Sequence, residues 1–288
     1  MLSLPRHALL AAVGAAVTLA AAVGFAPVSR TAPVAETATA PQDDNDAYNK
    51  AIEAAGPALV TVKFVMKAPN DQGFGDSEDE INGVMIDDKG LVLCSYWSIG
   101  GAYSRFAEGG AVPKPQDIRV LIGDDTEGKK ARLISHDSEL DLAWIRLDEA
   151  PTEPVKHLNL DAGAEGKIGD RLFLVSRMDK FFGRAQVVNE GRLRGIATTP
   201  RRLYAPTSSL LADRGDLGMP VFNADGAVVG FIIVQIPDKE SMEATDSLGG
   251  GPMILPVEQV ARATKRALEA APADGAAAQP APSAEAPK

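Results

Sequence analysis

The chain has 288 residues and a net charge of −10. This acidic balance disfavours general binding to nucleic acid or to an anionic membrane surface. The only cysteine, Cys94, excludes an internal disulfide and lies in an apolar VLC run, where it is predicted to be a small buried residue. The three histidines and this cysteine show no metal-ligand spacing, so neither a metal nor another cofactor is expected.

The amino-terminal residues are predicted to lie outside the folded domain. Arg6 and His7 precede the apolar run 8–26, a pattern typical of an export signal. A helix over this run would span roughly 28 Å at about 1.5 Å per residue, long enough for a membrane anchor. A cleaved signal peptide and a retained anchor both remain open, and each predicts a periplasmic or otherwise extracytoplasmic protein. Residues 27–46 are expected to form a disordered linker.

Short β-type runs recur after a helical lead at 47–56. Turn-forming sequences separate them and no helical period intervenes, which favours an all-β barrel or sandwich. The polar insert 67–80 is expected to be a mobile hairpin tip. The β-type runs are 58–66, 82–87, 90–96, 117–123, 129–137, 142–147, 170–176, 185–196, 219–223 and 227–235.

Two halves, about 47–152 and 153–256, each contain roughly half of these runs, which predicts two small β-barrels packed side by side. Apolar residues at helical spacing after Pro256 predict a helix over 256–270. The Ala/Pro-rich residues 271–288 are expected to be a disordered tail.

The order of these segments resembles the trypsin-like serine proteases of the exported HtrA/Deg type. NGVMIDDKGLVLCSYWSIGG (82–101) resembles the family's segment that ends in T-N-x-H-V, and ARLISHDSELDLAWIRL (131–147) resembles its D-x-x-x-D-L-A segment. RGDLGMPVFNADGAVVGFIIV (214–234) is similar to its G-N-S-G-G-P segment. The resemblance covers Ala58 to about Ala270 and implies a trypsin-like double β-barrel with a C-terminal helix. No PDZ domain is expected after it.

Catalysis in this family needs a serine nucleophile, a histidine base and an aspartate that orients the histidine. Matched position by position, the aspartate falls on Asp141, the histidine position holds Trp97 and the serine position holds Leu217. Indole cannot accept a proton and leucine carries no nucleophile. The resemblance therefore implies a pseudoprotease in which two of the three catalytic roles are empty.

The resemblance also bears on the oxyanion hole, on Met219 and on Asp141, some of which match the family pattern and some of which differ from it. The resemblance assigns the oxyanion hole to the backbone N–H groups of Gly215 and Leu217, with Asp216 between them. Met219 replaces the second glycine of the pattern and is expected to crowd the approach of a substrate backbone. Asp141 is either a partly exposed turn carboxylate or a buried one that accepts the indole Nε1–H of Trp97, with Trp97 and Leu217 packed over the former site.

The function expected from this pattern is that of an exported, catalytically inactive serine protease homologue acting as a peptide-binding, protein-binding or regulatory module. The alternative is an active HtrA-like endopeptidase with a rearranged site, in which His136 is the base for a relocated serine. The serines near the relevant segments are Ser95, Ser98, Ser208 and Ser209.

A basic segment, 177–202, contains seven Arg or Lys residues against Asp179 and Glu190. It is either a solvated face or the contact patch for a protein or peptide partner. The sequence does not indicate the partner's identity or the oligomeric state. The candidate patch residues are Arg192, Arg194, Arg201 and Arg202.

Overall fold

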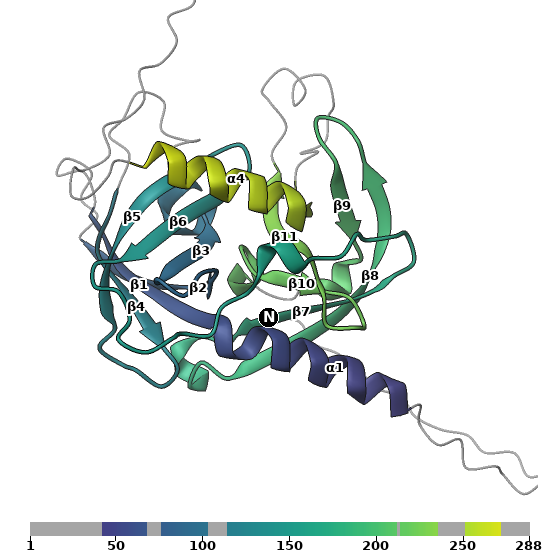
Figure 1. The fold of residues 1–288 in the computed structure, drawn as a ribbon, viewed down its shortest axis with the longest axis horizontal. Coiled ribbons are helices and arrows are strands. Elements are labelled where there is room, and N and C mark those ends of the chain that lie inside the picture. The colour runs from purple at the N-terminus through teal and green to yellow at the C-terminus, as the bar shows by residue number, and fades with distance from the viewer. Residues whose placement is uncertain (1–41, 68–75, 103–113, 212–213, 236–250, 272–288) are drawn as a thin grey trace, which may run out of the picture. The chain divides into compact units, whose positions relative to one another are not determined.

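The computed structural model describes residues 42–67, 76–102, 114–211, 214–235 and 251–271, which all belong to one unit, Ala40–Lys288 (Figure 1). The expected export segment 8–26 and the expected tail from 272 onward lie outside the described residues. In the described part of the chain, no helix is both long enough and apolar enough to span a bilayer.

Six antiparallel strands form the first closed barrel, in the order β1-β2-β3-β6-β5-β4 (Figure 1). Its interior is lined by large apolar side chains such as Phe64 and Leu93, both at most 1% exposed. Residues 77–80 continue β2, so this end of the insert 67–80 is strand rather than hairpin tip. The strands are β1 (Leu59–Lys67), β2 (Ser77–Met85), β3 (Leu91–Ser95), β4 (Lys114–Ile122), β5 (Lys129–Asp137) and β6 (Leu142–Leu147).

A second closed barrel follows, in the order β10-β11-β12-β9-β8-β7. The sequence did not predict β9 and β12, which are short and contain Pro206, Pro252 and Pro256, residues that usually interrupt strands. The prediction of two β-barrels with a C-terminal helix is confirmed. The strands are β7 (Arg171–Arg177), β8 (Gln186–Ala197), β9 (Leu203–Pro206), β10 (Pro220–Phe222), β11 (Val228–Gln235) and β12 (Gly251–Pro256).

Helix α1 (Gln42–Ala55) packs on β7 and β8 of the second barrel (Figure 1). It begins at Gln42, so residues 42–46 are helical rather than part of a disordered linker. Tyr48 holds the helix in place, because its ring lies 5.1 Å edge-on to Phe173 and its hydroxyl donates to Glu190 at 2.9 Å. The buried face is made of residues four positions apart, namely Ala47, Ala51 and Ala55.

Helix α4 (Val257–Ala270) starts directly after Pro256 and contacts β11 and β12 of the second barrel and β5 of the first. In the first barrel, Trp144 donates its indole N–H to Thr264 of α4 at 3.0 Å. The helix therefore ties the two barrels together. Short helical turns occur at Gly56–Ala58, Trp97–Gly101, Leu160–Ala162, Lys180–Phe182, Ser208–Leu210 and Arg214–Asp216.

Polar contacts also join the barrels directly. The side-chain amide of Asn82 on β2 donates to the carbonyls of Arg177 at 2.8 Å and Gly215 at 3.0 Å. Glu80, on the same strand, forms a two-pronged ion pair with Arg184, with N–O distances of 2.9 to 3.0 Å. These contacts fix the turn that contains Gly215 against the first barrel.

Candidate functional site

Asp141 stands at the start of β6 and is almost completely buried, with 3% of its surface exposed. The preceding turn is held by Asp137, whose carboxylate accepts from the amides of Glu139 and Leu140 at 3.0 Å each. The backbone of Asp141 has a φ of 54°, a left-handed conformation that aspartate tolerates better than most residues. The turn thus directs this carboxylate into the protein, and the exposed alternative considered from the sequence is not observed.

Three neighbours donate hydrogen bonds to the Asp141 carboxylate. The hydroxyl of Ser95 lies 3.0 and 3.1 Å from its two oxygens, and the amide of Val234 lies 2.8 Å from Oδ2. The amide of Trp97 lies 2.6 Å from Oδ1. The bond from Trp97 is therefore made by its backbone and not, as expected from the sequence, by its indole. Val234 belongs to β11 of the other barrel, so Asp141 also bridges the two barrels.

Burial raises the pKa of Asp141 to about 6, and the hydrogen bonds from Trp97, Val234 and Ser95 oppose this effect only in part. All of these donors are neutral. In an active triad the aspartate faces an imidazole and stabilises its positive charge. The described contacts of the Asp141 carboxylate include no cation.

The turn that contains Leu217 is pressed against the end of β3. Gly218 has a φ of 79°, and a Cβ at this position would lie 2.4 Å from the amide nitrogen of Ser95. Trp97 starts the helical turn that follows β3, so the structure brings Asp141, Trp97 and the Leu217 turn together. Both Trp97 and Leu217 are half-buried, and Leu217 packs against the hydrophobic core.

The residues around Leu217 differ from an open oxyanion site. Arg214–Asp216 forms a 3-10 turn. In such a turn the amides face carbonyls three residues earlier. Asp216 is buried and accepts from the hydroxyl of Ser176 at 2.9 Å. Met219 is fully buried and belongs to the hydrophobic core, and its expected effect on a substrate backbone stays a prediction.

The model of the trypsin-like peptidase domain family matches residues 82–231, just over half of the chain, a range that includes Trp97, Asp141 and Leu217. The chain belongs to the trypsin-like peptidase domain family. A related protein from Halomonas elongata, "Probable periplasmic serine endoprotease DegP-like", is 26% identical over 166 residues. That match covers 56% of this chain but only 31% of the relative, so the chain spans about a third of the relative's length. The solved structure of Deg5 matches with a TM-score of 0.53 and 14% identity, over 77% of this chain and 93% of Deg5.

Among the described residues of this trypsin-like domain, no serine side chain hydrogen-bonds to a histidine that could serve as its base. The Ser95 hydroxyl is completely buried and is engaged by Asp141 and by the amide of Ser98. The ring of His136 stacks on Tyr96, with centroids 4.2 Å apart and planes 8° apart. Ser208 and Ser209 lie in a turn of the other barrel. Among the described residues, none of the four candidate serines hydrogen-bonds to His136.

The candidate partner patch lies on the second barrel, and all of its arginines already make internal contacts. Arg192 and Arg194 project from β8 and donate to the carbonyls of Gly169 and Pro206, each at 2.9 Å. Arg201 pairs with Glu139 at 3.2 Å, and Arg202 pairs with Glu165. These ion pairs reduce the positive charge that the patch can offer a partner.

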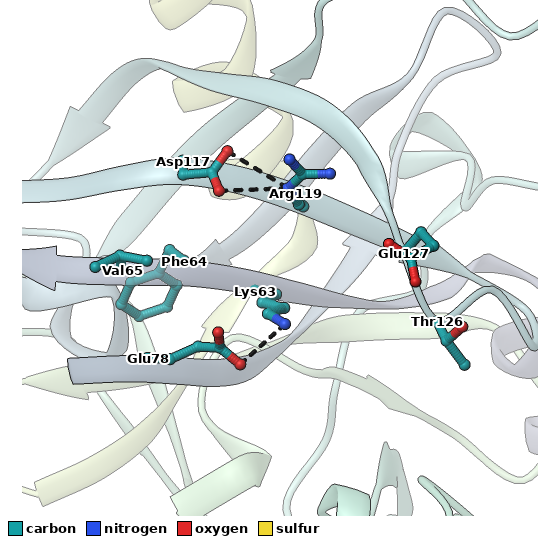
Figure 2. Close-up of a pocket in the computed structure, with 8 residues that line it drawn as sticks. All are labelled: Lys63, Phe64, Val65, Glu78, Asp117, Arg119, Thr126 and Glu127. Carbon is teal, nitrogen blue, oxygen red and sulfur yellow. Dashed lines mark hydrogen bonds and ion pairs between the residues drawn. The ribbon is translucent and has the colours of Figure 1, made fainter.

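A recess of about 230 Å³ lies on the outer wall of the first barrel and shares no residue with the Asp141 site (Figure 2). Its charged groups are already paired, Lys63 with Glu78 at 2.9 Å and Arg119 with Asp117 at 3.4 Å. Across the described ranges, no group of three or more His, Cys, Asp or Glu side chains could hold a metal ion.

The sequence did not indicate two groups that define this site. Val234 donates to Asp141 through its backbone amide, which leaves no trace in residue type. Ser95 was considered as a nucleophile, whereas the structure shows it as a hydrogen-bond donor to Asp141. The only sequence feature that could have indicated this role is that Ser95, a polar residue, directly follows Cys94 in an apolar run.

Proposed function

We propose that this trypsin-like domain is an exported, catalytically inactive serine protease homologue that acts as a peptide-binding, protein-binding or regulatory module. The proposal rests above all on the arrangement around Asp141. Its carboxylate meets only neutral donors, while Trp97 and Leu217 occupy the positions of the base and the nucleophile. Without a proton acceptor and an attacking oxygen, the acyl-transfer mechanism has no first step.

The oxyanion site supports the same proposal. An active oxyanion hole needs two amides that point outward at the developing negative charge. A 3-10 turn over Arg214–Asp216 precedes Leu217, and in such turns the closing amide faces the carbonyl three residues earlier rather than a ligand. The loss therefore extends beyond the two replaced side chains to the backbone that would stabilise the transition state.

Export is supported by the apolar run 8–26 and by the periplasmic relative. N-terminal sequencing of the protein purified from its native envelope distinguishes a cleaved signal peptide from a retained anchor. A start near residue 27 supports cleavage, and an intact apolar run supports an anchor. Recovery of an unprocessed chain from the cytoplasmic fraction alone would contradict export.

The proposal of inactivity is tested by fluorophosphonate labelling together with casein turnover. We expect no labelled serine and no turnover, whereas an active trypsin-like protease assayed in parallel is labelled and cleaves casein. Stoichiometric labelling of any serine would overturn the proposal and favour the rearranged endopeptidase. A His136→Ala variant then shows whether His136 is the base, because labelling would be lost with it.

A further inference from the structure

A half-buried arginine at the junction of the two barrels has few hydrogen-bond acceptors around its guanidinium. Arg177 ends β7, and its backbone carbonyl accepts from Asn82 of the first barrel. Its half-buried side chain reaches across to the carbonyl of Gly123, but the Nη1–O distance is 3.4 Å. Its Nε is buried without a hydrogen-bond partner. A guanidinium carries five N–H donors, so most of its capacity to bind oxygen is unused.

Neighbouring arginines show how this chain normally satisfies such a group. Arg184 holds the carboxylate of Glu80 with two nitrogens, and Arg171 donates to Glu190 at 2.8 Å. Arg177 has no equivalent carboxylate within ion-pair distance among the described residues. Burial lowers the pKa of Arg177, with a further contribution from the positive charge of Arg184, and Asp124 opposes this at longer range. Arginine nevertheless keeps its charge, so the group is a desolvated cation without a counterion.

We propose that Arg177 marks an anion-binding site between the two barrels, which takes a carboxylate or phosphate oxygen. A guanidinium binds both groups through paired N–H bonds, and such bonds are strongest where water is excluded. Nε is covered by protein atoms in this structure, so binding requires the Arg177 side chain to turn; an oxygen bound at Nε would then satisfy the donor that the protein leaves unpaired.

The site adjoins the turn at the family's serine position. Asn82 bridges the carbonyls of Arg177 and Gly215, and a Cβ on Gly215 would lie 3.6 Å from the Arg177 carbonyl. The backbone of Arg177 thus lies beside the turn that contains Leu217, while its side chain reaches toward Gly123. An acidic side chain of a bound peptide and free phosphate share the required chemistry. This inference names a ligand for the proposed binding module, but it does not depend on the absence of peptidase activity.

The site is tested by NMR on the full chain labelled with ¹⁵N-arginine, observed at the side-chain Nε–H groups. Inorganic phosphate and a blocked peptide with one glutamate are titrated separately at constant ionic strength. Sodium chloride and the same peptide with glutamine are the controls. We expect the Arg177 signal to shift saturably with phosphate, with the glutamate peptide, or with both. The pattern identifies the source of the anion. No shift with either one, or equal shifts with the controls, would overturn the site.

Three variants sharpen the test, with affinity measured by calorimetry and folding by thermal melts. Arg177→Gln should abolish binding, and Arg177→Lys should weaken it at least tenfold, because lysine keeps the charge but loses Nε and the planar fork. Arg119→Gln removes an arginine that is already paired with Asp117 (Figure 2) and should bind like the wild type. If Arg177→Gln does not fold, the lysine variant decides. Wild-type affinity in Arg177→Lys, or equal loss in Arg119→Gln, contradicts the proposal.

Discussion

Lowering the pH should stabilise the fold through Asp141. Burial raises the pKa of this carboxyl from 3.8 to about 6 in the folded protein. Between these two values the folded chain holds a proton that the unfolded chain has released, so stability falls as the pH rises. The contribution of Asp141 to the free energy of unfolding is fully present below about pH 4 and is lost as the pH rises through about 6. Each pKa unit corresponds to about 1.4 kcal/mol, which gives a total near 3 kcal/mol.

The measurement is urea unfolding of the wild type and Asp141→Asn from pH 4 to pH 7. The difference between the two free energies of unfolding isolates Asp141, because the other titrating groups cancel. Asparagine should destabilise by roughly 1–3 kcal/mol at pH 7, because its amide nitrogen would face the amide of Trp97 or Val234. We expect the wild type's advantage to be about 3 kcal/mol larger at pH 4 than at pH 7.

Two results would decide against this reasoning. A difference that stays constant between pH 4 and pH 7, or that grows with pH, would show that the donors around Asp141 outweigh its burial. Asp225→Asn is the matched control, because Asp225 lies exposed in a turn and its replacement should leave the pH profile of stability unchanged.

Three further predictions concern the remodelled site and the basic patch. Leu217→Ala should destabilise by about 1–2 kcal/mol in thermal melts, less than the roughly 2–5 kcal/mol of a fully buried leucine, because Leu217 is half-buried; no loss would place its side chain outside the core. Trp97→His combined with Leu217→Ser should still give no peptidase activity, because the 3-10 turn before Leu217 remains; serine-dependent turnover would show that only the two side chains are missing. Charge reversal of the patch should slow association with a partner captured from the envelope and flatten its salt dependence, and unchanged kinetics would leave the patch a solvated surface. The reversed residues are Arg192, Arg194, Arg201 and Arg202.

The sequence by itself determined most of the strands in their order along the chain. Alternating apolar residues and intervening turns are local signals, so runs such as 58–66 and 227–235 could be recognised one at a time. The spacing of apolar residues after Pro256 likewise predicted α4. The assignment of Asp141, Trp97 and Leu217 to the triad positions rests on the ordered motifs, which depend on residue type and spacing alone, and it stays a prediction.

Only the tertiary structure decided which strands close the second barrel. β12 pairs with β11 from Gly230↔Pro256 to Gln235↔Gly251, and with β9 through Ile254↔Tyr204. The prolines in β9 and β12 make these segments look unlike strands in the sequence. In the closed barrel, the backbone groups of the other residues in β9 and β12 still find partners on neighbouring strands. Pairing that depends on neighbours far along the chain has no local period from which it could be predicted.

The same limit applies to the contacts that define the site. Val234 reaches Asp141 from 93 residues away, and Asn82 reaches Gly215 from 133 residues away. Arg177 looked like one member of a basic segment until the packed barrels showed its Nε to be buried and unpaired. Burial and hydrogen-bond pairing depend on which surfaces pack together in the tertiary structure, and this packing cannot be read from the order of residue types.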